Sequence, residues 1–259
     1  MNQISLHKNK YLRFFLDFSY NGERFHGWQR QINASSVQQT IEECISIIQG
    51  SKISISGAGR TDTGVHAKQM IAHFDVNKLR LSKNDFMFKL NMLLPDTVHA
   101  NRIILVKDDA HARFNATSRT YKYYVSRIKD PFNYPFQYFL RDKLDYEKMN
   151  LAAVTLIGNN NMKCFSKSNT NVNNYICDVK EAFWEKTKNG GVFTITSNRF
   201  LRNMVRSIVG TLIEIGIEKK NIDNLDEIIN SQKRSNAGYS VPANGLFLTK
   251  VVYPQSIYI

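Results

Sequence analysis

The sequence predicts an α+β protein made of two ferredoxin-like (β-α-β-β-α-β) halves with mostly antiparallel sheets. Three observations support this fold class. Apolar residues alternate with polar ones where strands are expected, apolar residues recur at helical spacing elsewhere, and the same order of elements occurs twice within 259 residues. We therefore expect an N-terminal half at residues 1–110 and a C-terminal half at residues 111–259, with a central basic cleft where they meet.

The elements of the first half follow from alternation and then from helical spacing. Every second residue from Leu12 to Phe18 is apolar, which predicts a half-buried strand over residues 11–20. Ser36 is a good helix-capping residue, and the apolar residues after it predict a helix that ends near Gln49. Further elements are expected as a short strand at residues 53–55, a strand at 70–76, a helix at 82–93 and a strand at 98–106.

The second half repeats this order. Asn189-Gly190-Gly191 is a turn signal between two apolar runs, so it predicts a hairpin. The expected elements are a strand at residues 119–126, a helix at 146–157, the hairpin strands at 175–184 and 192–197, a helix at 200–216 and a strand at 246–253. Long loops are expected at residues 128–142 and 163–174, and loops of such length are often functional.

The charge of the chain points to a polyanionic partner. Thirty-five Lys and Arg against 22 Asp and Glu give a net charge of +13 and a pI near 9.6. Such a surplus attracts nucleic acid, although a basic protein without that partner remains an alternative.

Other classes of protein are not indicated. The apolar run from Ile208 is short and contains Glu214, so no membrane span is expected, and the first residues lack the apolar run of a signal peptide. Three widely spaced cysteines (Cys44, Cys164 and Cys177) indicate neither disulfides nor a metal site, which favours a reducing, cytoplasmic location.

The glycine-rich segment at residues 56–67 is the densest chemical signal. It lacks the lysine of a phosphate-binding P-loop and the glycine spacing of a dinucleotide site. What it does present is Asp62 close to Arg60. A carboxylate beside a cation suits a nucleophile, but a turn in which Asp62 caps its own backbone is an equally good local explanation.

Residues 59–67 (GRTDTGVHA) resemble the active-site motif of the tRNA pseudouridine synthase A family. Four other segments resemble further signatures of that family in the expected order: residues 20–38, 113–123, 200–210 and 242–246. The resemblance spans about residues 11–253. The sequence departs from the family pattern at Thr63, where alanine is usual, and at Gly158-Asn159-Asn160-Asn161-Met162, where the family shows Gly-x-His-Asp-Phe.

The resemblance implies a role for each matching residue. Asp62 would be the catalytic nucleophile, Arg206 would pair with it, and Tyr121 would stack on the extruded base. Arg60 would contact RNA and hold the target nucleotide out of the stack.

Three further residues are candidates for binding the substrate. On the helix expected from residue 200, Arg199 and Arg202 lie opposite an apolar stripe together with Arg206. This face is ordinarily solvated, and both residues are also candidates for phosphate contacts. Leu246 is a candidate for lining the base pocket, although a core leucine is the commoner case.

The resemblance also implies the substrate and the assembly. The substrate would be the tRNA anticodon stem-loop at uridines 38, 39 and 40, and the protein would act as a homodimer. No cofactor is expected, because the isomerisation involves no redox change. No metal is expected either, because His66 and His73 lack a third ligand at plausible spacing. The alternatives are a non-catalytic RNA-binding protein or a tRNA-folding chaperone.

Overall fold

The structure of this chain is a computed structural model that describes residues 11–168 and 172–259. The expectations for the first residues and for the middle of the 163–174 loop lie outside the described residues. The first half contains β1 (Leu12–Tyr20), α1 (Val37–Gln49), β2 (Ser56–Gly57), β3 (His66–Val76), α2 (Lys83–Leu93) and β4 (Val98–Val106). In this half β1 lies between β3 and β4 and is antiparallel to both, while β2 pairs with β3.

The second half repeats this arrangement. It contains β5 (Ser118–Ser126), β6 (Tyr138–Phe139), α3 (Tyr146–Ala153), β7 (Gly158–Asn161), β8 (Ile176–Thr187), β9 (Gly190–Ser197), α4 (Met204–Gly216), α5 (Asn224–Ser231) and β10 (Leu246–Val252). Here β5 lies between β9 and β10 and is antiparallel to both, and β8 follows β9. The predicted α+β class, with two similar units and mostly antiparallel pairing, is confirmed.

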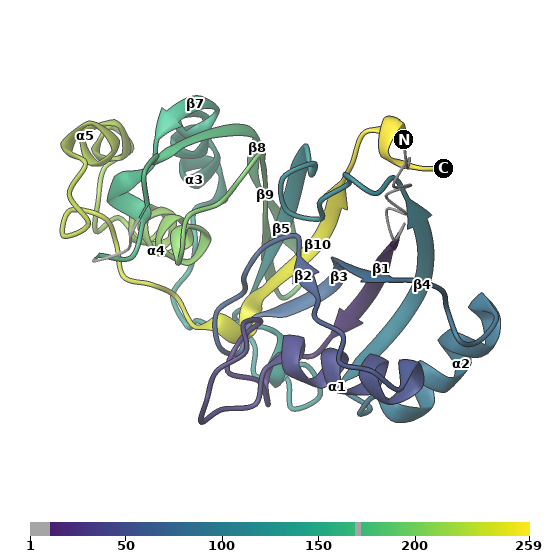
Figure 1. Ribbon diagram of the computed structural model, residues 1–259. Helices are drawn as coiled ribbons and strands as arrows, with labels where there is room; N and C mark the ends of the chain where they lie inside the picture. The colour runs from purple at the N-terminus through teal and green to yellow at the C-terminus, as the bar shows by residue number, and fades with distance from the viewer. Residues whose placement is uncertain (1–10, 169–171) are drawn as a thin grey trace, which may run out of the picture.

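Within the described residues the two halves share one ten-stranded sheet, in which eight strands follow the order β4-β1-β3-β10-β5-β9-β8-β7, while β2 pairs with β3 and β6 with β5 beside this path. The junction is β10, which pairs in parallel with β3 at His66 and Ala67 and antiparallel with β5. Because β2 covers only the far part of β3, near Ala72 and His73, the near part remains open for β10. Figure 1 shows β10, in yellow, running between the strands of the two halves. The division at residue 110 and the central cleft stay predictions.

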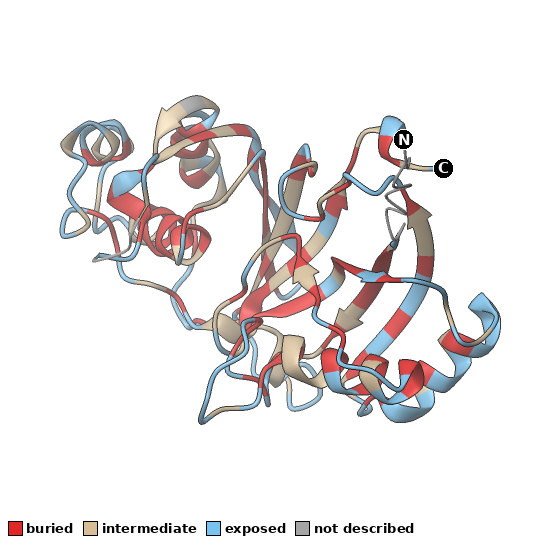
Figure 2. Cartoon of the chain, in the orientation of Figure 1, coloured by how far each residue is buried: buried red, intermediate tan, exposed pale blue. Residues whose placement is uncertain are grey.

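Each half has its own core, and β10 contributes to both. Leu248 and Val251 pack into the first core, whereas Leu246 packs into the second. Helices α1 and α2 lie beside the strands of the first half, and α3, α4 and α5 gather at the other end of the molecule (Figure 1). Buried residues follow the strands and fill most of α4, while α2 is largely exposed (Figure 2). No helix within the described ranges is long and apolar enough to cross a membrane.

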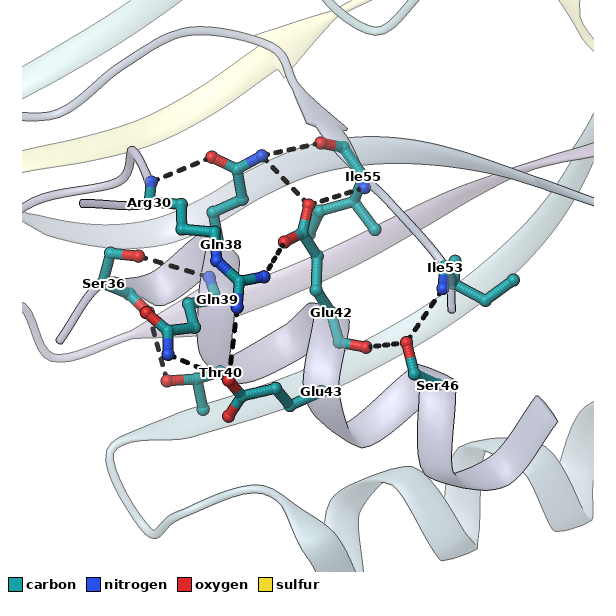
Figure 3. A network of polar contacts seen from close by, with 10 residues as sticks. All are labelled: Arg30, Ser36, Gln38, Gln39, Thr40, Glu42, Glu43, Ser46, Ile53 and Ile55. Atoms are coloured by element: carbon teal, nitrogen blue, oxygen red, sulfur yellow. Dashed lines mark hydrogen bonds and ion pairs between the residues drawn. The ribbon is translucent and has the colours of Figure 1, made fainter. Parts of the chain in front are cut away.

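The helix starts at Ser36 and Ser82 are confirmed, but the strand expected at residues 53–55 is wrong. The Ser36 hydroxyl accepts a hydrogen bond from the Gln39 amide, and Ser82 caps α2 in the same way. The amides of Ile53 and Ile55 donate to side chains of α1, to the Ser46 hydroxyl at 2.9 Å and to the buried Glu42 carboxylate at 3.0 Å (Figure 3). Because α1 uses these donors, the strand begins only at Ser56.

Two boundaries in the second half also differ from prediction. The hairpin turns at Lys188 and Asn189, and Gly190 lies within β9, where a Cβ atom would come 2.0 Å from the Val125 carbonyl oxygen. This glycine therefore permits close strand approach rather than a turn. The predicted helix at residues 146–157 ends at Ala153 and continues as a 3₁₀ turn.

The helix expected from residue 200 begins only at Met204. Asn203 has φ = 67°, a left-handed conformation that cannot be part of a right-handed helix. Arg199 and Arg202 consequently precede α4 and do not share a helical face with Arg206. The sequence also did not predict α5, β6 or β7, and the last of these covers most of the segment that departs from the family pattern.

We predict that His73 makes the stability of the fold depend on pH. Its Nδ1 accepts the Ala112 amide at 3.2 Å, which requires a neutral ring. Burial, together with the positive charges of Arg13 and His111, lowers the pKa of His73 to about 4. The folded pKa is below the ordinary value of about 6.5, so this stabilisation is complete above pH of about 6.5 and is lost as the pH falls toward 4.

The measurement is urea unfolding between pH 7 and 4 for wild type and His73→Gln, which keeps an acceptor oxygen but does not titrate. The variant should show a shallower fall in the free energy of unfolding over this range. Equal slopes in the two proteins would contradict the assignment.

Candidate active site

The loop between β2 and β3 carries Asp62 and is fixed by contacts on both sides of it. The Thr61 carbonyl accepts the Trp28 amide at 3.2 Å, and the Thr61 hydroxyl lies 2.8 Å from the buried Tyr20 hydroxyl. Behind Asp62, the Val65 amide donates to the Asp62 carbonyl at 3.2 Å. The backbone is therefore held, while the Asp62 side chain remains 26% exposed.

Two glycines of the N-terminal signature allow this loop to pack closely. A Cβ atom on Gly27 would lie 2.5 Å from the Thr61 carbonyl oxygen, and one on Gly22 would lie 2.0 Å from that of Val65. Gly27 also has φ = 88°, which favours glycine. Sequence reasoning missed this role, because the contact joins segments far apart in the chain.

Two arginines of the second half face the Asp62 carboxylate. The Arg202 Nε atom lies 3.6 Å from Oδ1, and an Arg206 terminal nitrogen lies 3.8 Å from Oδ2. Both distances are ion-pair distances beyond hydrogen-bonding range. Within residues 11–168 and 172–259, no group donates a hydrogen bond to this carboxylate, so its lone pairs are free to attack an electrophilic carbon.

The two arginines differ in how firmly they are held. Arg206 is 21% exposed, and its Nε donates to the Val241 carbonyl at 2.7 Å, while the Val241 amide donates to the Arg206 carbonyl at 3.2 Å. Arg202 precedes the helix and is 60% exposed. The structure thus brings Arg206 to Asp62, as the resemblance implied, and it also brings Arg202 there, which had been considered only for phosphate contacts.

Tyr121 lies on β5 between Leu248 of β10 and Ile195 of β9. Its ring packs edge-on against Phe200, with 5.0 Å between the ring centroids. Burial raises the pKa of Tyr121 to about 12; the positive charge of Arg119 lowers it and the negative charge of Asp62 raises it. The phenol is therefore protonated at neutral pH, and the role of Tyr121 in stacking on the base stays a prediction.

The remaining predicted residues fall into two groups. Arg60 is exposed and Arg199 is partly exposed, and neither makes a hydrogen bond or ion pair with any residue that the structure describes. Both are thus available to an anionic ligand. Leu246 is 5% exposed and belongs to the second core, so its role in lining a base pocket stays a prediction.

The two histidines considered as metal ligands have structural contacts. His66 Nδ1 accepts the Gly22 amide at 3.0 Å, and its ring stacks on Phe247. His73 accepts the Ala112 amide. Among the described residues, no cluster of three or more His, Cys, Asp or Glu is suited to hold a metal ion.

Arg119, to which the sequence assigned no role, joins three segments around the site. Its guanidinium donates to four backbone carbonyls: Ala58 at 2.8 Å, Arg113 at 2.5 Å, Ala116 at 3.1 Å and Asn198 at 2.6 Å. Ala58 leads into the Asp62 loop, and Asn198 leads toward Arg202 and Arg206. Arg119 therefore links the segment that leads to Asp62 with the segment that leads to Arg202 and Arg206.

The sequence match agrees with this geometry. Residues 18–115 and 152–254 match the family described as tRNA pseudouridine synthase, and the chain belongs to this family. Curated relatives named tRNA pseudouridine synthase A are similar over nearly their whole length. The protein of Bacteroides fragilis is 45% identical over 247 residues, covering 95% of this chain and 98% of the relative. The protein of Parabacteroides distasonis is 47% identical over 249 residues, covering 95% of this chain and 98% of the relative. The protein of Porphyromonas gingivalis is 47% identical over 250 residues, covering 95% of this chain and 99% of the relative.

We predict that Arg119→Lys lowers the free energy of unfolding by about 2 kcal/mol. The lysine ammonium group has only three donors and lacks the planar fork of a guanidinium, so it cannot satisfy four carbonyls spread over three segments. The measurement is urea unfolding at pH 7. Arg113→Lys is the matched control, since the exposed Arg113 guanidinium makes no hydrogen bond with a described residue, and its effect should stay within about 0.5 kcal/mol. Equal stability of the two variants would contradict the role of Arg119 in joining these segments.

Proposed function

We propose that this protein isomerises uridine to pseudouridine in tRNA with Asp62 as the nucleophile, at positions 38, 39 and 40 of the anticodon stem-loop. Membership of the tRNA pseudouridine synthase family carries the reaction class. The observation that supports the role of Asp62 is its partly exposed carboxylate, free of hydrogen bonds from the described residues and faced by the anchored Arg206. No observation favours a non-catalytic alternative.

The reaction breaks the bond between uracil N1 and ribose C1′ and forms a bond between C5 and C1′. A proton leaves C5 and N1 ends with one, so atoms balance without oxidation or reduction. The protein must therefore supply a nucleophile, a surface that holds the uracil while it turns, and a means of moving protons. Asp62 supplies the first, and Arg206 keeps its carboxylate in position.

Tyr121 is the group best suited to hold the uracil. Its ring is fixed against Phe200 and by the strands on both sides, and its phenol is protonated at neutral pH. A protonated phenol offers the base an aromatic surface and an O–H donor. This arrangement supports the proposal that the target base leaves the RNA stack and packs on Tyr121.

Phosphate contacts would offset the cost of unstacking the target base. Arg60 and Arg199 are free of polar partners among the described residues, and the side chain of Arg202, 60% exposed, is open to a phosphate as well as to Asp62 at 3.6 Å. The proposed homodimer rests on family resemblance, and the proposed cytoplasmic location rests on the three cysteines, which are free.

We predict that Asp62→Ala abolishes tritium release from tRNA labelled at uridine C5, without added nucleotide or metal. The affinity for tRNA should remain close to that of wild type, because the phosphate contacts are unchanged. Asp62→Asn, which keeps the shape of the side chain, should be equally inactive. Release by either variant would remove Asp62 as the nucleophile, and absence of release by wild type would refute the reaction.

We predict that the two arginines beside Asp62 separate into different kinetic roles. Arg206→Ala should lower kcat by about 100-fold, since loss of an anchored partner displaces the carboxylate. Arg202→Ala should mainly weaken tRNA binding and reduce the slope of log affinity against log salt by about one. Steady-state kinetics and filter binding at several salt concentrations test both. The same effect in both variants would contradict the division of roles.

A further inference from the structure

An exposed aromatic ring lies on a tightly held turn beside the Asp62 loop. Phe114 is 75% exposed, and the adjacent Arg113 places its guanidinium carbon 5.7 Å from the centre of the ring. Isolated exposed apolar residues are common and need no explanation by themselves. The rigidity of this turn and its surroundings are what distinguish Phe114.

The turn at residues 111–115 is fixed by hydrogen bonds within itself. The Asn115 amide donates to the His111 carbonyl at 3.0 Å, and the Asn115 side-chain oxygen accepts the His111 amide at 2.6 Å. The Arg113 amide donates to His111 Nδ1 at 3.1 Å. The backbone that carries Arg113 and Phe114 is therefore held in one conformation, and both side chains are exposed.

Three residues from other parts of the chain anchor the same turn. His73 Nδ1 accepts the Ala112 amide, the Tyr253 hydroxyl donates to the Ala112 carbonyl at 2.5 Å, and Arg119 donates to the Arg113 carbonyl. The Phe114 ring also rests on His111, with 4.3 Å between the ring centroids, and His111 in turn contacts His73 at 4.5 Å. A row of three rings thus runs from the core to the surface and ends at Phe114.

The turn lies next to the Asp62 loop. One nitrogen of Arg119 donates both to the Arg113 carbonyl, at 2.5 Å, and to the Ala58 carbonyl, at 2.8 Å. The backbone that carries Phe114 is therefore two hydrogen bonds away from the loop that carries Arg60 and Asp62.

Asp108 and Asp109 precede the turn and act on Arg13, whereas the charges on the side joined to the Asp62 loop are cationic and indicate a polyanion. Arg113 and Arg60 are exposed, and neither forms an ion pair with a described residue. Arg113 and Arg199 both lie close enough to Arg119 to lower its pKa, after burial as the main cause. An aromatic surface among cations without carboxylate partners suits single-stranded nucleic acid, in which bases stack and phosphates pair with arginine.

We propose that Phe114 is a stacking platform for an unpaired nucleobase of the RNA substrate near the target uridine, with Arg113 contacting an adjoining phosphate. This inference rests on the proposed function for its ligand, an RNA. It adds a second base-binding position to that of the target base on Tyr121, and it gives the central signature of the chain a physical role: its first residues bind RNA while Arg119 fixes them to the catalytic loop.

The test compares three substitutions of Phe114 in filter binding of unmodified full-length tRNA at fixed salt. Phe114→Leu keeps apolar character without an aromatic face, Phe114→Ala removes the side chain, and Phe114→Trp enlarges the ring. We expect the Leu and Ala variants to bind about fivefold to 100-fold more weakly and the Trp variant to bind at least as well as wild type. The salt dependence of the three variants should match wild type, because no charge is removed, whereas Arg113→Ala should reduce the slope by about one.

Phe88→Leu is the matched control, since Phe88 lies on α2 and is 71% exposed but outside this turn. It should bind tRNA as wild type does. Wild-type affinity of Phe114→Leu would overturn the proposal. So would an affinity loss that accompanies a change of oligomeric state in sedimentation, because Phe114 would then be a protein contact.

Tritium release by wild type separates this proposal from the proposed function. If wild type releases tritium and Phe114→Leu binds tRNA normally, only the platform is wrong. If wild type binds tRNA in a Phe114-dependent manner without releasing tritium, the platform stands and the proposed reaction fails.

Discussion

The Asp62 carboxylate of the first half lies within 4 Å of two guanidinium groups of the second half, and this contact depends on how the two halves are joined. Asp62 is on a loop that has no regular hydrogen bonding of its own, and Arg202 and Arg206 flank the start of a helix more than 100 residues later. An error of about 1 Å in such a geometry costs about 100-fold in rate. The two halves therefore have to behave as one body at this point.

Three features hold the two halves together near Asp62: a shared strand, close backbone packing and a side chain that bridges segments. The sheet joins the halves through β10, whose side chains enter both cores. The glycines at positions 22 and 27 let the N-terminal segment contact the Asp62 loop directly. Arg119 then links the loop to the approach to α4 through backbone carbonyls. Because carbonyl oxygens fix a guanidinium without neutralising it, Arg119 contributes position and positive charge together.

The parts of this protein that follow from local sequence were predictable, and the parts that depend on distant contacts were not. The helix starts at Ser36 and Ser82 follow from one capping hydroxyl each, and the alternation of β1 identifies its strand. The Asp62 motif could be recognised because its residues are contiguous. By contrast, the amides of Ile53 and Ile55 bond to α1, and the left-handed Asn203 delays α4, so both boundaries depend on tertiary structure. The four carbonyls bound by Arg119 have no sequence signature, because every residue has a carbonyl.

The arginines around the Asp62 loop differ in how many of their polar groups are already bonded within the protein. This difference bears on how RNA binding and the geometry of the site are related. Arg119 and Arg206 are held by carbonyls, whereas Arg60 and Arg113 have no anionic partner among the described residues; Arg202, exposed but near Asp62, is intermediate. The pKa of Arg119 is lowered mainly by burial and further by the positive charges of Arg113 and Arg199, which repel the charge of Arg119. A polyanion that engages the free arginines relieves this repulsion and leaves the anchored arginines in place. Under the proposed function, RNA binding would stabilise the arrangement of charges around Asp62, which would link affinity to the geometry of the site through electrostatics rather than through a change of fold.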